Sequence, residues 1–164
     1  MKKVSIVMGS DSDLPVMKKA TAVLEQFSVE YEVHVYSAHR TPEKVAELAE
    51  NARKNNVGVI IAGAGMAAAL AGVVAGHTTV PVIGVPLKSA ALDGVDALLS
   101  TVMMPSGIPV ATVAIDGAKN AAYLAMEILA VSDEELQKRL EKDRETMKQG
   151  VLEKNAKVEK EFNK

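Results

Sequence analysis

The alternation of short apolar segments with amphipathic ones limits the possible folds of this chain more than any other feature. Each of the first three apolar runs ends in a turn rich in glycine or serine, and a stretch of helical spacing follows it. Strands that alternate with helices in this way form a parallel sheet covered on both faces. The expected strands are Val4–Met8, Tyr31–Val35, Val57–Ala62, Val80–Val85 and a fifth within Ile108–Ile115.

The segments between the strands place apolar residues three and four positions apart, which is the spacing of a buried helix face. Thr41 and Pro42 suit the cap and the first turn of the second of these helices. The expected helices are Leu14–Phe27, Pro42–Ala52, Met66–Ala75, Asp93–Ser100 and Gly117–Ala130.

The polarity of the strands predicts their order in the sheet. Tyr31–Val35 alternates apolar and polar residues, as a half-exposed edge strand does. Val4–Met8 and Val57–Ala62 are continuously apolar and belong at the centre. We therefore expect an α/β fold, a three-layer, flavodoxin-like parallel sheet in the order 2-1-3-4-5, with a ligand crevice at the carboxyl ends of the first and third strands.

The last part of the chain, residues 132–164, differs in kind from the rest. Ser132-Asp133-Glu134-Glu135 is a capping-box signal, and about thirty highly charged residues with a thin apolar stripe follow it. This pattern predicts a long C-terminal helix that reaches across the body or a neighbouring subunit. We expect a single domain over residues 1–164, with an α/β core at 1–131 and a helical extension at 132–164.

Composition excludes several classes of function. The net charge of −2 gives no electrostatic case for binding nucleic acid or an anionic membrane. Because cysteine is absent, disulfides, thiol catalysis and cysteine-ligated metals are excluded. The first apolar run is too short for a signal-peptide core or a membrane span, so we expect a cytoplasmic protein. Aromatic residues make up only 3%, and a core of small side chains buries little area per residue, which favours oligomerisation.

The segment Ser37–Pro42 contains the strongest candidates for catalytic and ligand-binding side chains. His39, a titratable group, lies beside Arg40, a fixed cation, on a strand-to-helix loop at the expected crevice. A histidine can act as acid or base without a metal, and an arginine suits phosphate or carboxylate recognition. No second histidine or acid stands at ligand spacing from His39, so we expect no metal. We expect His34 to be solvated and His77 to have a structural role.

The turns after the first and third strands add features that suit a phosphate. Gly9–Asp13 offers backbone N–H groups, hydroxyls and acids for a phosphate and a ribose, although ordinary helix capping by Ser12 or Asp13 is an equal alternative. Gly63–Ala68 matches the dinucleotide fingerprint G-x-G-x-x-A, but Pro86-Leu87-Lys88 after the next strand lacks the acid that binds a ribose. We therefore expect a smaller phosphorylated ligand at this crevice.

Four motifs in register resemble those of the small carboxyaminoimidazole ribonucleotide mutase family of purine biosynthesis. They are Gly-Ser-x-Ser-Asp at 9–13, Ser-Ala-His-Arg-Thr-Pro at 37–42, Gly-Ala-Gly-x-Ala-Ala at 63–68 and Met-Pro-x-Gly-Ile-Pro-Val-Ala-Thr at 104–112. The resemblance covers essentially the whole chain, from Val4 through the C-terminal helix.

This resemblance implies a cofactor-free rearrangement in which the carboxylate of N5-carboxyaminoimidazole ribonucleotide moves from the exocyclic nitrogen to the ring carbon. Carbon dioxide is lost, retained in the pocket and recaptured, and the family's histidine, here His39, transfers the proton that restores aromaticity. The positions that match or complete the family's ligand site are Ser10, Ser12, Asp13, Ser37, Arg40, Gly63, Ala64, Gly65, Ala67 and Leu70. The family assembles as a homo-octamer.

The chain departs from the family pattern at four positions. The family commonly reads Gly-Gly-Ala-Ala-His-Leu-Pro-Gly where this chain has residues 65–72, so Met66 and Ala71 stand in place of a glycine and a proline. Ala69 stands where the family commonly has a histidine, and Met103 replaces a common glutamine. A sister branch carboxylates aminoimidazole ribonucleotide directly with carbon dioxide, but Arg40, in place of that branch's usual lysine, favours the mutase. A non-catalytic nucleotide-binding module of flavodoxin-like fold is the rival from another class.

Overall fold

Five parallel strands form one sheet in the order β2-β1-β3-β4-β5, which confirms the expected fold. The structure is a computed structural model and describes residues 1–163. The strands are β1 (Lys3–Met8), β2 (Tyr31–Val35), β3 (Val57–Gly65), β4 (Val82–Leu87) and β5 (Ala111–Thr112).

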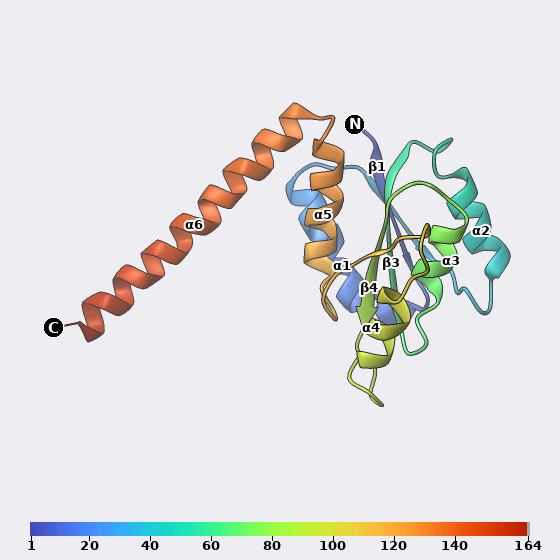
Figure 1. The fold of residues 1–164 in the computed structure, drawn as a ribbon. Helices are drawn as coiled ribbons and strands as arrows, with labels where there is room; N and C mark the ends of the chain where they lie inside the picture. The colour runs from blue at the N-terminus through green and yellow to red at the C-terminus, as the bar shows by residue number, and fades with distance from the viewer. Residues whose placement is uncertain (164) are drawn as a thin grey trace.

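Helices cover both faces of the sheet, as the alternating pattern requires (Figure 1). They are α1 (Leu14–Gln26), α2 (Pro42–Asn51), α3 (Leu70–Gly76), α4 (Val95–Val102), α5 (Ala118–Ala130) and α6 (Glu134–Phe162), and a short 3₁₀ turn, η1 (Asp11–Asp13), precedes α1. The helices α1 and α5 lie on one face, and α2 and α3 lie on the other. Within residues 1–163, no helix is both long and apolar enough to cross a membrane.

Two apolar clusters, one on each face, hold the layers together. Ile61 of β3 packs with α1 and α5, whereas its neighbour Ile60 packs with α2 and α3, because successive strand residues point to opposite faces. Small residues let the layers approach closely. A Cβ on Gly84 of β4 would collide with the side chain of Thr101 and lie 2.9 Å from Val110 Cγ1.

The edge strand β2 is oriented differently from the sequence-based expectation. Val33 and Val35 are 39% and 49% exposed, whereas Glu32 and His34 are partly buried. His34 is therefore not simply solvated: its ring stacks on Tyr36 at 5.3 Å between centroids. The strand pairs with β1 alone, and its apolar face lies open.

The fifth strand lies within the expected segment Ile108–Ile115 and is short. Only Ala111 and Thr112 pair with β4, opposite Ile83 and Gly84. Pro109 has no N–H group for the ladder, which shortens the strand at its start. The fourth strand is also displaced, by two residues at each end, from the expected Val80–Val85.

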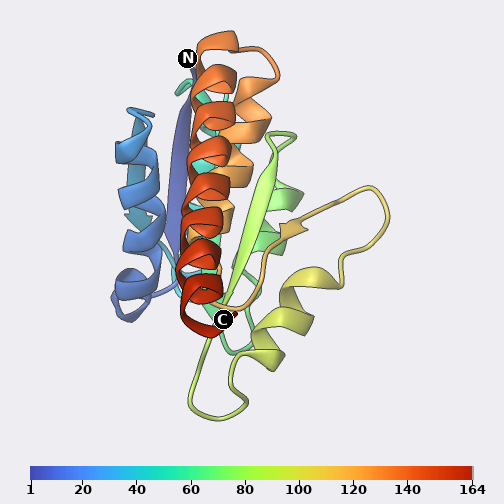
Figure 2. The same ribbon diagram turned by 90° about the vertical axis from the view of Figure 1, so that its left-hand side faces the viewer.

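The C-terminal helix α6 begins at the body of the domain and then leaves it (Figures 1 and 2). Its cap is Asp133, whose carboxylate accepts a hydrogen bond from the Leu136 N–H at 2.9 Å, so Ser132 does not cap it. Leu136 and Leu140 are buried against the body. The later apolar side chains are exposed: Met147, Val151, Leu152, Val158 and Phe162. The helix therefore does not cross its own domain.

A hydrogen bond from Tyr123, a partly buried residue of α5, ties the first part of α6 to α5. The Tyr123 hydroxyl donates a hydrogen bond to Asp143 at 2.8 Å. Burial, together with this carboxylate, raises the pKa of Tyr123 to about 12. The phenol therefore keeps its proton, and the bond persists, over the whole physiological pH range.

We expect Gly84→Ala to lower the free energy of unfolding by about 1–3 kcal/mol, because the new methyl group meets short, stiff neighbours. Urea unfolding at fixed protein concentration measures the change. Gly76→Ala is the matched control, since a Cβ there meets no atom within 4 Å. Equal stability of the two variants would show that the layers are not closely packed at Gly84.

Candidate functional site

The carboxyl ends of the four longer strands surround a cleft of about 730 Å³. Segments far apart in sequence supply its walls, following or ending β1, β2, β3 and β4. The predicted site residues that line it are Ser10, Ser12, Asp13, Ser37, His39, Arg40, Ala64, Gly65, Ala67 and Leu70. The structure therefore brings together all but one of the residues selected from the sequence.

Gly63 is the exception, because it lies beneath the cleft and does not line it. It pairs with Val85 of β4 and accepts a hydrogen bond from the Gly9 N–H at 3.1 Å. The segment Gly63–Gly65 is the last part of β3 and is not the turn that the sequence suggested. Its glycines and alanine end the strand directly under the ligand space.

The loop after β1 is closed by reciprocal capping bonds. The Ser10 N–H donates to Asp13 Oδ2 at 3.0 Å, and the Ser12 N–H donates to Ser10 Oγ at 3.3 Å. Capping is thus present, but Ser10 is the cap, in place of Ser12 or Asp13. Both hydroxyls and the carboxylate still line the cleft.

Asp13 is held in an environment that disfavours its charge. Burial raises the pKa of this carboxyl above its ordinary value of 3.8, and the nearby Asp11 acts in the same direction. The hydrogen bond from the Ser10 N–H opposes the shift and does not cancel it. A partly desolvated carboxylate at a cleft wall is a strong acceptor for ligand hydroxyl groups.

The loop after β2 is fixed by Thr41, which is the N-cap residue of α2 as expected, but its side chain accepts no hydrogen bond from the helix. Instead, Thr41 Oγ1 accepts from the Ser37 N–H at 2.9 Å, and the Thr41 N–H donates to the Ser37 carbonyl at 2.8 Å. The Arg40 N–H donates to Ser37 Oγ at 3.2 Å. These bonds hold His39 and Arg40 at an exposed loop tip that lines the cleft.

The segment after β3 is not helical until Leu70, four residues later than expected. Met66 has a left-handed backbone with φ of 56°, which interrupts any continuous helix from the strand end. The residues 66–69 form an irregular wall, in which the Ala69 N–H donates to the Ala67 carbonyl at 2.8 Å.

Lys88 and Ser89 also line the cleft, and sequence reasoning did not select them. The Lys88 N–H donates to Asp116 Oδ1 at 2.9 Å, and its ammonium group lies 3.1 Å from Asp93. The signal was available, because Lys88 follows the fourth strand at the same edge of the sheet.

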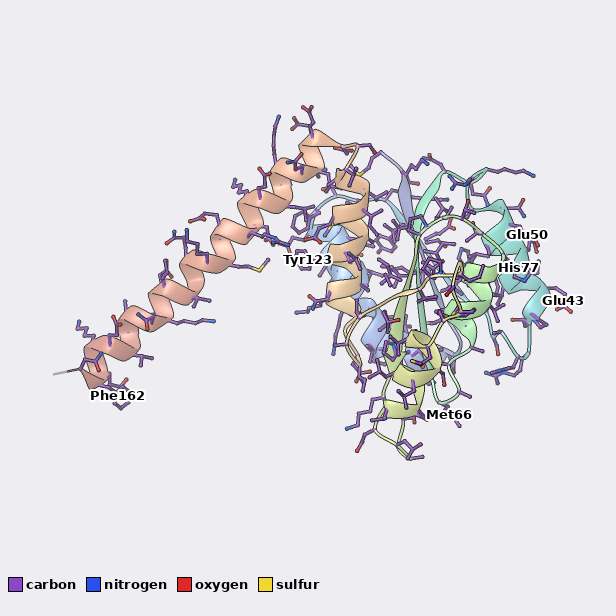
Figure 3. The ribbon with its side chains drawn as sticks, viewed as in Figure 1. Glu43, Glu50, Met66, His77, Tyr123 and Phe162 are labelled. Atoms are coloured by element: carbon purple, nitrogen blue, oxygen red, sulfur yellow. The ribbon has the colours of Figure 1, made fainter. Side chains whose placement is uncertain are left out.

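His77 lies outside this cleft. Its Nδ1 is 3.2 Å from Glu50 Oε1, and Figure 3 shows the two side chains next to each other. With Arg53 they line a second cleft of about 750 Å³, which also contains Ile108 and Pro109 of the fourth sequence motif. Within residues 1–163, no group of three or more histidine and acidic side chains is placed to hold a metal ion.

The fold and the cleft define a flavodoxin-like α/β protein with a cleft at the carboxyl edge of its sheet, the place where proteins of this fold class bind their ligands. Arg40 and Lys88 give this site two cations for an anionic ligand, and His39 gives it a group that can carry a proton.

The chain belongs to the AIR carboxylase family, whose model matches residues 3–150. It is 63% identical to the N5-carboxyaminoimidazole ribonucleotide mutase of Pyrococcus abyssi, over 90% of this chain and 85% of that protein. It is 55% identical to the protein of the same name from Methanocaldococcus jannaschii, over 97% of this chain and 99% of that protein. The crystal structure of Treponema denticola PurE matches with a TM-score of 0.86 at 33% identity, covering 94% of this chain and 97% of that one.

We expect Asp13→Asn to remove a pH dependence of stability, because Asn keeps an acceptor for the Ser10 N–H and lacks the charge. Below pH 3.8 both folded and unfolded Asp13 hold the proton. As pH rises, Asp13 loses its proton in the unfolded chain before it does so in the folded one. The free energy of unfolding of the wild type therefore falls relative to that of Asp13→Asn. The fall ends once the pH has passed the raised pKa of Asp13 in the folded protein. Unfolding curves from pH 3 to 7 measure this; a wild type that gains on the variant as pH rises would contradict it.

Proposed function

We propose that the protein is an N5-carboxyaminoimidazole ribonucleotide mutase of de novo purine biosynthesis. It converts N5-carboxyaminoimidazole ribonucleotide into 4-carboxy-5-aminoimidazole ribonucleotide. The observation that carries the proposal is the presence of His39, Arg40 and Asp13 in one cleft, contributed by loops that are far apart in sequence. Relatives that carry the mutase name and share more than half of the residues support it.

The polar side of the cleft suits the ribose phosphate. The Arg40 guanidinium and the hydroxyls of Ser10, Ser12 and Ser37 hold the phosphate, since an arginine fork and hydroxyl groups match its oxygens. Asp13 accepts hydrogen bonds from the ribose hydroxyls. The substrate carries a second anion, its carboxylate, and Lys88 is the second cation of the cleft.

The reaction replaces a bond between nitrogen and the carboxylate carbon by a bond between the ring carbon and that same carboxylate carbon. The bond between the exocyclic nitrogen and the carboxylate carbon breaks, carbon dioxide forms, and the nitrogen takes a proton from the protonated His39 imidazole. The ring carbon then attacks carbon dioxide, and His39 takes the proton from that ring carbon, which restores aromaticity. Atoms balance without an added reactant, so the isomerisation needs no cofactor.

The apolar side of the cleft suits the carbon dioxide intermediate. Ala64, Gly65, Ala67 and Leu70 form a wall without charged groups beside the proton carrier. A neutral molecule held against such a wall is shielded from water until the ring carbon captures it.

We also propose that the protein assembles as a homo-octamer. Apolar side chains are exposed on three separate elements: Val35 on β2, Leu99 on α4, and Val151 on the projecting part of α6. Contiguous exposed apolar side chains mark interaction surfaces, and α4 exposes Val95, Leu99 and Val102 at positions three and four residues apart. The projecting α6 has the length to reach a neighbouring subunit (Figure 1).

Direct carboxylation of aminoimidazole ribonucleotide is the second candidate, favoured by the name of the family model. The purified protein should be assayed with each substrate at matched concentrations. We expect efficient turnover of N5-carboxyaminoimidazole ribonucleotide and at least a tenfold lower kcat/KM for aminoimidazole ribonucleotide with carbon dioxide, about 1.4 kcal/mol in transition-state stabilisation. Efficient turnover of the second substrate alone would replace the mutase by the carboxylase.

We expect His39→Asn to lower kcat by about 10²- to 10⁴-fold, because asparagine can hydrogen-bond but cannot carry the proton. Product affinity, measured by calorimetry, should change little, because the phosphate and ribose contacts remain. His77→Asn is the matched control, since it removes an exposed histidine outside the cleft. An unchanged rate in His39→Asn would favour a nucleotide-binding module or a different proton carrier.

A further inference from the structure

Met66 combines two unfavourable features in one residue of the cleft. Its large apolar side chain is 66% exposed, and its backbone is left-handed. The other non-glycine residues with positive φ in the described chain are all polar: Ser28, Asn56, Asp93 and Asp116. Asparagine and aspartate adopt this conformation several-fold more often than most residues, whereas a bulky apolar side chain there is an outlier. Such strain persists mainly where function requires it.

Met66 lies at the cleft, where its side chain contributes to one wall. It follows the last residue of β3 and lines the cleft at the carboxyl end of the sheet (Figure 3). Met66 and Leu70 are the large apolar side chains among the lining residues, and Leu70 is only 2% exposed. The neighbouring wall of Ala64, Gly65 and Ala67 is small, so the apolar bulk on this side comes from Met66.

We propose that Met66 is a flexible cover that closes over the bound ligand and retains carbon dioxide between the two bond changes; this rests on the proposed mutase function. An unbranched thioether side chain adapts its shape to whatever it covers. If carbon dioxide escapes after the carbon–nitrogen bond breaks, aminoimidazole ribonucleotide is left and the isomerisation fails. An apolar group at the mouth of the cleft opposes both that escape and the entry of water.

Three substitutions separate the side chain from the backbone strain. Met66→Leu keeps both the apolar bulk and the strain, Met66→Ala keeps the strain alone, and Met66→Gly removes both. Ser28→Gly is the control, because it removes a side chain at another positive φ, on an exposed turn between α1 and β2. If the side chain acts as a cover, Met66→Ala should behave as Met66→Gly does, because both lack the apolar bulk. If the strained backbone matters instead, Met66→Ala should behave as the wild type does.

The test uses substrate labelled with ¹³C at its carboxylate, turned over in unlabelled bicarbonate buffer, with the label in the product measured by mass spectrometry. The wild type, Met66→Leu and Ser28→Gly should retain most of the label, and Met66→Ala and Met66→Gly should lose about fivefold more, with more aminoimidazole ribonucleotide released. Thermal melts show whether the variants are folded. Met66→Gly relaxes the backbone, so it still provides the test if Met66→Ala does not fold.

The possible outcomes distinguish this inference from the function on which it rests. If both Met66→Ala and Met66→Gly retain label as the wild type does, the cover is wrong and the mutase proposal stands. If the wild type itself forms no product from the labelled substrate, the mutase function is wrong. If Met66→Gly alone loses label, the backbone conformation is responsible and the cover is again wrong.

Discussion

The parallel pairing of β3 between β1 and β4 is the interaction on which the rest of the structure depends. It sets Gly63 beside Met8, the last residue of β1, and pairs Gly65 with Leu87, the last residues of β3 and β4, so that three strands end within two residues of one another. The loops that follow are thereby held around one cleft, although each is separated from the next by a helix. A hydrogen bond from Gly9 to Gly63 joins the first loop to the central strand at this edge.

The cleft combines two stiff loops with one adaptable side chain. Reciprocal bonds between Ser10 and Asp13, and between Ser37 and Thr41, fix the polar groups before a ligand arrives. Preorganised groups of this kind bind without a large loss of conformational freedom. Met66 differs, because it is exposed and unbranched, and it stands at the wall where the intermediate is proposed to lie.

The polarity and spacing of apolar residues predicted the strand order, and the family motifs supplied the ten predicted residues that line the cleft. Parallel topology explains why the loops that carry these residues meet. Sequence patterns failed where one backbone conformation or one hydrogen bond decides the local structure. The left-handed Met66 delays α3 to Leu70, and the hydroxyl of Thr41 binds Ser37 in place of capping α2. Lys88 carries no recognisable motif, and only the parallel pairing of β4 with β3 brings it to the cleft.

We propose that the loops after β1, β2 and β3 hold one ribonucleotide, with His39 at its imidazole ring. A crystal structure with bound 4-carboxy-5-aminoimidazole ribonucleotide tests it most directly. We expect the phosphate to lie against Arg40 and Ser10. We expect the His39 imidazole to lie within hydrogen-bond distance of the carboxylate on the ring carbon. A ligand seated in the second cleft beside His77 and Arg53, or a His39 ring turned away from the bound imidazole, would contradict it.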